Sequence, residues 1–322
     1  MIELSRIDEV ELEVRPYTLR LTEPLRTARG TITSRSGFVV EARRRGRVGR
    51  GEACVMPELG TETLEECARE LRGEEPRTPA ARCALEQAVL DLDAQELGLP
   101  LAKLLDRKAQ AGVECSALLT SHSMPDLARE ARRAAAEGFR TLKLKVGLGD
   151  DFARAAVVRD AAGQGARLRL DANEAWDAIQ ALRSLRELAP LGIEFCEQPT
   201  RDLLGLSGCP VPLAADELCV RDFDAALARA SVVVLKPMLL GGLRPALALA
   251  RRAQQAGVGV VITTSLDGAI ARAGAAHLAA AVGGPFAHGL ATGRLLERDL
   301  CPDALAPRDG RVVIPDAPGL GL

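Results

Sequence analysis

From about Val113 onward, short apolar runs alternate with longer amphipathic stretches that are rich in Ala and Arg. The short runs are typical of buried strands, and the stretches between them have the spacing of helices. Because parallel strands need long crossover connections, this alternation predicts a barrel of parallel strands surrounded by helices. The predicted strands are Val113–Leu119, Thr141–Val146, Arg167–Asp171, Ile193–Glu197, Pro212–Ala215, Val232–Lys236, Gly257–Thr263 and Phe286–Leu290.

The first third of the chain has a different pattern, because its strand-like and helical segments do not alternate regularly. This mixture predicts an α+β unit with an antiparallel sheet. Its longest helix is expected to end where a glycine and then a proline follow the last periodic residue. The predicted elements are strands at Val10–Val14 and Phe38–Ala42, a turn over Gly46–Gly51, and helices at Leu64–Leu71 and Ala80–Leu97.

The chain of 322 residues is long enough for one barrel and an accessory domain. We predict an α+β domain over residues 1–110, a barrel over residues 111–296 and a C-terminal segment over residues 297–322. This last segment is rich in Pro and Gly and contains one strand-like run, Arg311–Ile314. We expect it to return to the first domain.

Composition and charge exclude several classes of function. The 42 Lys and Arg residues nearly balance the 44 Asp and Glu, so neither nucleic acid nor an anionic membrane is expected as a partner. The most apolar stretch, Ala269–Val282, is interrupted by Arg272 and His277, which argues against a membrane span. The N-terminal residues are charged throughout and the eight cysteines form no CxxC pair, so we expect a cytoplasmic protein with reduced thiols.

Polar side chains gather at the carboxyl ends of the predicted barrel strands, where the active sites of such barrels lie. Side chains alternate along a strand, so Lys143 and Lys145 share one face, as do Asp171 and Asn173. Both pairs can therefore face the mouth of the barrel. The three following strands end in Glu197, Asp216 and Lys236.

The carboxylates Asp171, Glu197 and Asp216 come from successive strands and would meet as hard oxygen ligands of a divalent cation. Mg²⁺ is the natural candidate, with Mn²⁺ as an alternative. The sequence therefore predicts a metal site at the mouth of the barrel.

Lysine is rare in this chain, and its placement is informative. Only five of the 42 basic residues are lysines, and three of the five are Lys143, Lys145 and Lys236. Arg stays protonated, whereas a buried Lys can lose its proton and act as a general base. Any one of these lysines alone would be interpreted as an ion-pairing surface residue, and Asp216 or Asn173 alone as a helix cap. Their combination in strand order favours an acid/base site.

The motifs KLK, DAN, CEQP, ADE and LKP follow one another in this order. With these motifs the chain resembles the enolase superfamily, in its muconate-lactonizing-enzyme-like branch, over nearly its whole length. The resemblance implies a modified TIM barrel with an N-terminal α+β capping domain. It also implies Mg²⁺ binding by Asp171, Glu197 and Asp216, and acid/base roles for Lys143, Lys145 and Lys236.

Such a site would remove a proton next to the carboxylate of a small-molecule substrate. That proton is weakly acidic, so the metal would stabilise the negative charge of an enediolate intermediate. Lys145 is the expected base, and Lys143 is a nearby positive charge that would favour its neutral form. Lys236 would act on the opposite face of the substrate or stabilise charge there.

Within this superfamily the chain is similar to the o-succinylbenzoate synthase family. Pro24–Gly30 and Arg35–Gly37 resemble the capping loop of that family, and Gly289–Gly293 resembles the end of its barrel. The similarity implies a carbon–oxygen lyase of menaquinone biosynthesis. An N-succinylamino acid racemase or a dipeptide epimerase, which would use two opposed lysines, is the alternative. Dipeptide epimerases of the family carry a DxD pair at the eighth strand, and residues 286–293 contain none.

Three residues are further candidates for contact with the substrate. Ser265 and Gly268 precede a predicted helix, so their backbone groups are expected to receive a substrate carboxylate at its N-terminus. Asn173 lies on the same strand face as Asp171. No feature of the sequence marks an interface between subunits, which leaves a homo-oligomer open.

Overall fold

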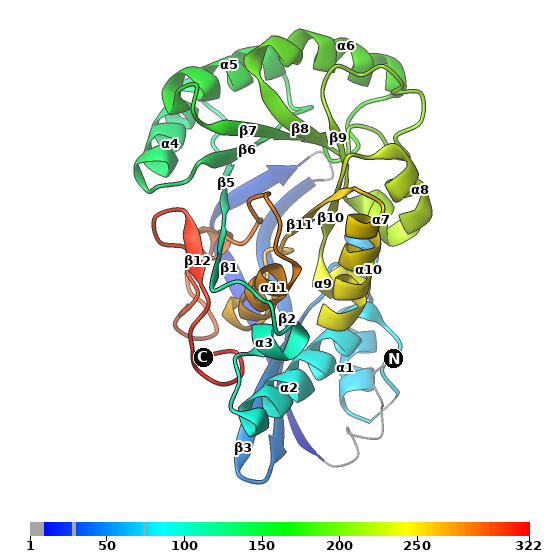
Figure 1. Cartoon of the computed structure of the whole chain (residues 1–322), viewed down its shortest axis with the longest axis vertical. Helices are drawn as coiled ribbons and strands as arrows, with labels where there is room; N and C mark the ends of the chain where they lie inside the picture. The colour runs from blue at the N-terminus through cyan, green and yellow to red at the C-terminus, as the bar shows by residue number, and fades with distance from the viewer. Residues whose placement is uncertain (1–9, 28–29, 74) are drawn as a thin grey trace.

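The computed structural model describes residues 10–27, 30–73 and 75–322, so Ala28 and Arg29 of the predicted capping loop lie outside the described residues. Figure 1 shows the parallel strands of the barrel above and the N-terminal sheet and helix α2 below and behind. The elements in chain order are β1 (Glu11–Thr27), β2 (Gly30–Arg44), β3 (Arg47–Cys54), η2 (Pro57–Leu59), α1 (Leu64–Leu71), α2 (Pro79–Leu97), α3 (Leu101–Leu105), β4 (Gly112–Glu114), β5 (Ser116–Leu119), α4 (Met124–Ala136), β6 (Thr141–Lys145), α5 (Asp151–Ala162), β7 (Arg167–Asp171), α6 (Ala178–Leu188), η3 (Ala189–Leu191), β8 (Ile193–Glu197), β9 (Leu213–Ala215), α7 (Glu217–Arg221), α8 (Phe223–Arg229), β10 (Val232–Leu235), α9 (Pro237–Leu240), α10 (Leu243–Gln255), β11 (Gly259–Ile262), α11 (Ala269–Val282), η4 (Gly293–Leu295) and β12 (Arg311–Val313).

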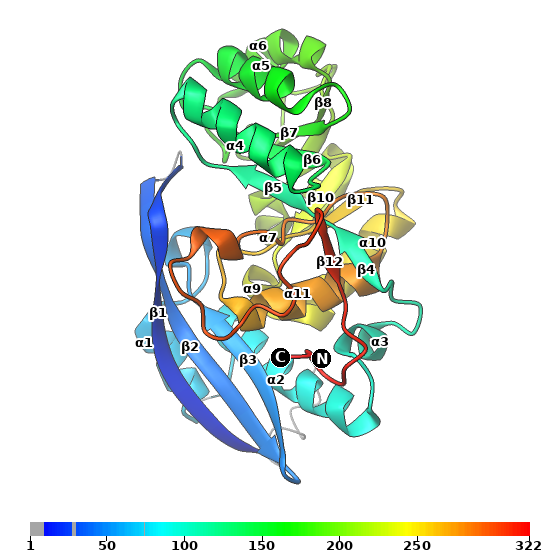
Figure 2. The ribbon, with the colours of Figure 1, turned by 90° about the vertical axis from the view of Figure 1, so that its left-hand side faces the viewer.

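The N-terminal strands form an antiparallel sheet in the order β1-β2-β3, which stands beside the barrel in Figure 2. Helix α2 packs on this sheet, and its alanines and leucines share a core with Phe38, Val40 and Ala53. Nearly the whole of α2 is buried, because its other faces contact α9, α10 and α11 of the barrel. Both predicted helices of this unit are confirmed, and Gly98 ends α2 in the left-handed conformation expected of it.

The predicted turn over Gly46–Gly51 is wrong in most of its length. Only Arg45 and Gly46 form the turn, and β3 begins at Arg47. Gly51 lies within β3, and α2 passes so close to it that no side chain fits. A Cβ atom at Gly51 would lie 1.9 Å from the carbonyl oxygen of Ala84. Gly49 is similar, because a Cβ atom there would lie 2.1 Å from the carbonyl oxygen of Ala88, so helix packing requires both glycines.

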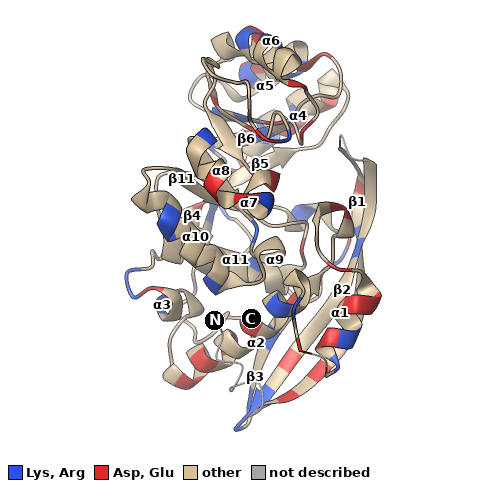
Figure 3. Ribbon diagram, turned by 90° about the vertical axis from the view of Figure 1, so that its right-hand side faces the viewer, with Lys and Arg blue, Asp and Glu red and all other residues tan. Residues whose placement is uncertain are grey.

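The barrel contains seven parallel strands in the order β11-β10-β9-β8-β7-β6-β5. Their positions confirm the first seven predicted strands to within a few residues, except that the first is divided into β4 and β5. The eighth is reduced to single bridges, from His288 to Cys115 and from Gly289 to Thr263, which join the two edges of the curled sheet. Charged residues are frequent on β1–β3 and α1 in Figure 3, whereas α11 is almost without them.

The C-terminal segment runs back across the amino-terminal side of the barrel. Its strand β12 pairs antiparallel with β4, in agreement with the strand-like run in the sequence. The backbone N–H of Leu320 then donates to Asp91 Oδ1 of α2 at 2.8 Å, and Arg50 of β3 donates to the carbonyl of Leu322 at 3.3 Å. Among the described residues, no helix has both the length and the apolar character needed to span a membrane.

The close contact between α2 and β3 gives a prediction for stability. Gly51→Ala would force the helix and the strand apart, and we expect it to lower the free energy of unfolding by roughly 3 kcal/mol. Urea unfolding of the variant and the parent protein measures this change. Gly165→Ala is the control, because a Cβ atom at Gly165 meets nothing within 4 Å. Equal stability of the two variants would contradict the packing argument.

Candidate active site

A cavity of about 280 Å³ lies between the carboxyl ends of the barrel strands and the N-terminal domain. The barrel contributes charged and hydroxyl groups, and the N-terminal domain contributes mainly apolar side chains. The lining residues are Leu25, Gly30, Thr31, Ile32, Met56, Glu58, Leu59, Ser116, Leu118, Lys143, Lys145, Asp171, Asn173, Glu197, Asp216, Glu217, Lys236, Thr263, Thr264, Ser265, Leu266, Gly289, Ala291 and Thr292.

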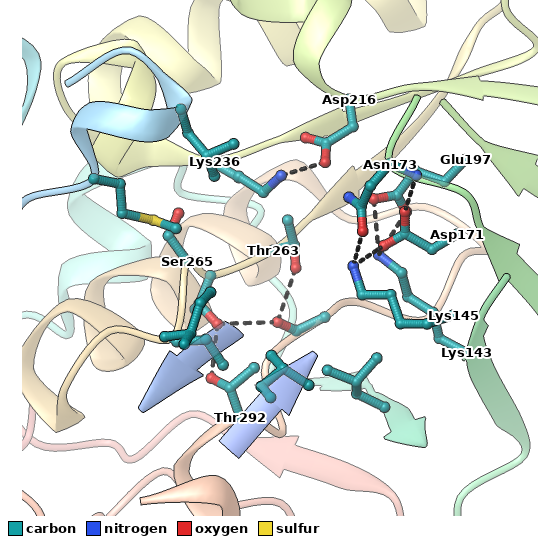
Figure 4. Close-up of a pocket in the computed structure, with 18 of the residues that line it drawn as sticks. Lys143, Lys145, Asp171, Asn173, Glu197, Asp216, Lys236, Thr263, Ser265 and Thr292 are labelled. Atoms are coloured by element: carbon teal, nitrogen blue, oxygen red, sulfur yellow. Dashed lines mark hydrogen bonds and ion pairs between the residues drawn. The ribbon is translucent and has the colours of Figure 1, made fainter. Parts of the chain in front are cut away.

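Strands β6, β7 and β8 bring two lysines and two carboxylates together on one side of this pocket (Figure 4). The strand register pairs Lys145 with Asp171, and Asp171 with Glu197, at the same level of the barrel. Lys143 Nζ lies 2.7 Å from Glu197 Oε1 and 2.8 Å from Asp171 Oδ2. Lys145 Nζ lies 2.8 Å from Asp171 Oδ2 and also donates to Asn173 Oδ1.

Lys236 approaches the pocket from the other side, from the end of β10, and Asp216 at the end of β9 lies between Lys236 and Glu197. The Lys236 ammonium donates to Asp216 Oδ2. Figure 4 shows Lys236 across the pocket from Lys143 and Lys145. The structure thus brings together all six charged residues that the sequence singled out.

The charges of this cluster depend strongly on one another, because its carboxylates are buried. Burial alone would raise the pKa of Asp171, but Lys143 and Lys145 outweigh it and hold that pKa well below its usual range. Burial and the negative charge of Asp171 raise the pKa of Glu197. For Lys143 and Lys236, burial is outweighed by the neighbouring carboxylates, which raise the pKa of both amines. The lysines therefore serve here as counter-ions of the acids.

The donor set has the chemistry of a divalent-cation site. Asp171, Glu197 and Asp216 offer only carboxylate oxygens, and these are already arranged around positive charge. The Lys143 ammonium lies between two of the three acids, and within the described residues no three acidic, His or Cys side chains surround a common point. The residues therefore fit a divalent cation once the ammonium groups give up these oxygens, and the metal site stays a prediction.

Gln198 was missed by the sequence interpretation, although it belongs to the CEQP motif. Its side chain is fully buried, and its Oε1 accepts the backbone N–H groups of Asp216 at 2.8 Å and Leu218 at 3.2 Å. Its Nε2 donates to the carbonyls of Thr200 at 2.8 Å and Arg201 at 3.2 Å. These hydrogen bonds attach the backbone at Asp216 to the residue that follows β8. Gln198 thus holds Asp216 beside Glu197.

Several residues at this edge have a backbone conformation that is unusual outside glycine. Asn173 has φ of 45° and Gln198 has φ of 40°, both in the left-handed region. Leu266, in the loop after β11, has φ of 62°. Such conformations persist only where the surroundings impose them, and they are concentrated at functional sites.

The structure separates the two residues that were predicted to receive a substrate carboxylate. Ser265 lines the pocket, but the backbone N–H that was predicted to bind the carboxylate donates to Asp267 Oδ2 at 3.2 Å. The Ser265 Oγ is buried and has no hydrogen-bond partner among the described residues. The prediction for Gly268 is wrong, because its N–H donates to Glu52 Oε1 of β3 at 2.6 Å and the residue does not line the pocket. A carboxylate of the protein itself occupies that helix N-terminus.

Comparison with known proteins identifies the family. Residues 126–322 match the family model described as enolase C-terminal domain-like. The chain belongs to the enolase superfamily. This result confirms the family and the fold that were predicted from the motifs at the strand ends.

Relatives with different reactions are similarly close to this enolase-superfamily chain. It is 36% identical to o-succinylbenzoate synthase of Thermobifida fusca, with coverage of 89% of this chain and 84% of the relative. It is 33% identical to L-Lys-D/L-Arg epimerase of Methylococcus capsulatus, with coverage of 97% and 98%. The structure of the dipeptide epimerase from Enterococcus faecalis V583, complexed with Mg and the dipeptide L-Leu-L-Tyr, superposes with a TM-score of 0.87 at 30% identity, with coverage of 97% and 99%.

The hydrogen bonds of Gln198 give a prediction for stability. Gln198→Leu keeps the approximate volume but leaves the N–H groups of Asp216 and Leu218 unpaired, so we expect the free energy of unfolding to fall by roughly 3 kcal/mol. Thermal or urea unfolding measures the change. Gln254→Leu is the control, because that side chain is exposed and makes a single hydrogen bond within the described part of the chain, to Val282. Similar losses in the two variants would contradict the role assigned to Gln198.

Proposed function

We propose that this protein is an o-succinylbenzoate synthase, a Mg²⁺-dependent dehydratase that removes the proton next to a substrate carboxylate. The main support for this proposal is the composition of the pocket wall at the eighth strand. Gly289, Ala291 and Thr292 line the pocket there, and no carboxylate lies between residues 286 and 293. A dipeptide would bring an ammonium group that needs a carboxylate partner. The cyclohexadiene substrate of the synthase carries no ammonium group and so needs no such partner.

The opposite wall agrees with a substrate that contains a ring. Leu25, Ile32, Met56 and Leu59 of the N-terminal domain line the cavity. Apolar side chains of this kind bury a hydrocarbon ring favourably and make no specific demand on its substituents. The 36% identity to the synthase of Thermobifida fusca supports the same assignment.

Mg²⁺ is the proposed metal, held by Asp171, Glu197 and Asp216. These acids fit a hard cation, and the related epimerase of Enterococcus faecalis was crystallised with Mg. When bound, the cation would stabilise the negative charge that develops on the substrate carboxylate during deprotonation. It would also replace the ammonium groups as the positive charge beside the buried acids.

The lysines of β6 would then carry out the proton transfers. Lys145 removes the proton next to the carboxylate, and Lys143 provides a positive charge beside it. The protonated Lys145 returns the proton to the departing hydroxide on the same face of the ring, so that water leaves and the ring becomes aromatic. This reaction needs Lys236 only as a positive charge on the opposite side.

Racemisation of an N-succinylamino acid is a second candidate, and the position of Lys236 favours it. Lys145 and Lys236 line the same pocket from opposite strands, the arrangement needed to remove a proton on one face and return it on the other. Epimerisation of a dipeptide would use the same two lysines but lacks a partner for the ammonium group at the eighth strand.

The decisive experiment follows the cyclohexadiene chromophore of the synthase substrate. We expect its absorbance to fall rapidly with purified protein and Mg²⁺, to persist when the metal is removed with a chelator, and to fall again when Mg²⁺ is restored. Turnover that survives thorough chelation would contradict the metal requirement. Absence of turnover together with racemisation of N-succinylamino acids, followed by optical rotation, would replace the dehydratase by the second candidate.

Single lysine variants test the assignment of the base. Lys145→Ala should lower kcat at least about a thousandfold, because a positioned general base contributes on that scale. Stabilisation by Mg²⁺ should persist in a thermal shift measurement. Lys236→Ala should reduce dehydration far less but abolish any racemisation. Lys108→Ala, at an exposed lysine, is the control for loss of charge. Retained dehydration in Lys145→Ala would exclude Lys145 as the base.

A further inference from the structure

The loop between β11 and α11, residues 263–268, forms one wall of the pocket and is held from the N-terminal domain. Its first four residues line the cavity. Leu266 has a left-handed backbone, with φ of 62°, and its side chain packs with Leu19, Leu21 and Leu25 of β1. Because a leucine rarely adopts this conformation, the loop depends on outside contacts to keep it.

A second contact from the N-terminal domain is a set of hydrogen bonds made by Glu52. Glu52 of β3 is fully buried, and its Oε1 accepts the N–H of Gly268 at 2.6 Å while Oε2 accepts the N–H of Ala271 at 2.9 Å. Tyr17 of β1 donates its hydroxyl to Oε1 at 2.7 Å. A carboxylate that accepts the first N–H groups of a helix is favoured by both the hydrogen bonds and the helix dipole.

Gly268 is adapted to this carboxylate. A Cβ atom there would lie 2.6 Å from Leu300 Cδ1 and 2.9 Å from both carboxylate oxygens of Glu52. The glycine therefore allows the acid to approach the helix end, and its φ of −72° is an ordinary one. Steric clearance for Glu52 and Leu300 accounts for the glycine better than backbone freedom does.

We propose that Glu52 is a positioning residue, a carboxylate of the capping domain that fixes the β11–α11 loop in the conformation that shapes the pocket. Glu52 does not line the pocket, so it does not contact the groups to which the proton transfers are assigned. It acts through Gly268 and Ala271, and through them on Ser265 and Leu266 at the pocket wall. The effect on turnover rests on the proposed function, whereas the effect on the loop does not.

The test combines Glu52→Ala with amide hydrogen exchange. The variant frees the N–H groups of Gly268 and Ala271, so peptides covering residues 263–271 should exchange about tenfold faster than in the parent protein. KM for the synthase substrate should rise about tenfold, with kcat changed much less, because substrate binding is affected and the base is not. Glu41→Ala is the matched control: Glu41 is a buried acid of the same sheet, but it pairs with Arg15 and Arg43.

Chemical rescue separates positioning by a carboxylate from simple packing. Formate can enter the space left in Glu52→Ala and accept the freed N–H groups, so it should restore both the exchange protection and KM, whereas chloride at equal ionic strength should do so much less. If formate restored neither the exchange protection nor KM, Glu52 would act only by filling space, and the proposal would be overturned. Exchange and KM equal to those of the parent protein would also overturn it.

The role of Glu52 can also be tested if Glu52→Ala does not fold or if the parent protein has no synthase activity. If Glu52→Ala does not fold, Glu52→Gln replaces it, because the amide keeps the shape but offers a single acceptor oxygen; unchanged exchange in that variant would contradict the proposal. If the parent protein does not turn over the synthase substrate, the proposed function fails. The exchange and rescue measurements then still decide the role of Glu52.

Discussion

The balance of buried charge at the carboxyl ends of β6–β10 is the constraint on which the rest of the site depends. Asp171, Glu197 and Asp216 are almost completely buried, and a buried acid is costly unless positive charge lies beside it. Lysines from β6 and β10 provide that charge in this structure. Because the same acids are the proposed metal ligands, a cation that bound these carboxylates would also release the amines, one of which is the proposed base. Positioning elements such as Gln198 keep these groups in reach of one another.

The sequence predicted the barrel and its charged centre well, for a physical reason. Strands buried on both faces are continuous apolar runs, and the alternation of side chains places the polar residues at their ends on known sides. Lys143, Asp171 and Glu197 were therefore found from strand position alone. The outer strands were predicted too short: β1 extends over Glu11–Thr27 and β2 over Gly30–Arg44, because exposed strand residues carry little apolar signal.

Features that depend on distant contacts were beyond the sequence. The helix N-terminus at Gly268 looked open to a ligand, but its partner Glu52 lies 216 residues earlier in the chain. The glycines of β3 looked like a turn because nothing local reveals the approach of α2. Most of the apolar wall of the pocket was missed for the same reason: Ile32, Met56 and Leu59 do not differ from core residues until the two domains are placed together. The hydroxyl and backbone contacts of the β11–α11 loop likewise appear only in three dimensions.

The left-handed residues at the edge of the pocket have a consequence for the evolution and engineering of this enzyme. Asn173, Gln198 and Leu266 each hold a backbone conformation that glycine adopts at lower energy, but glycine would lose the contacts that their side chains make. These contacts impose the left-handed conformations and allow them to persist. Heat-resistant variants are therefore best sought in the outer helices. At the strand ends, a substitution that relaxes the backbone also removes side-chain contacts that shape the pocket.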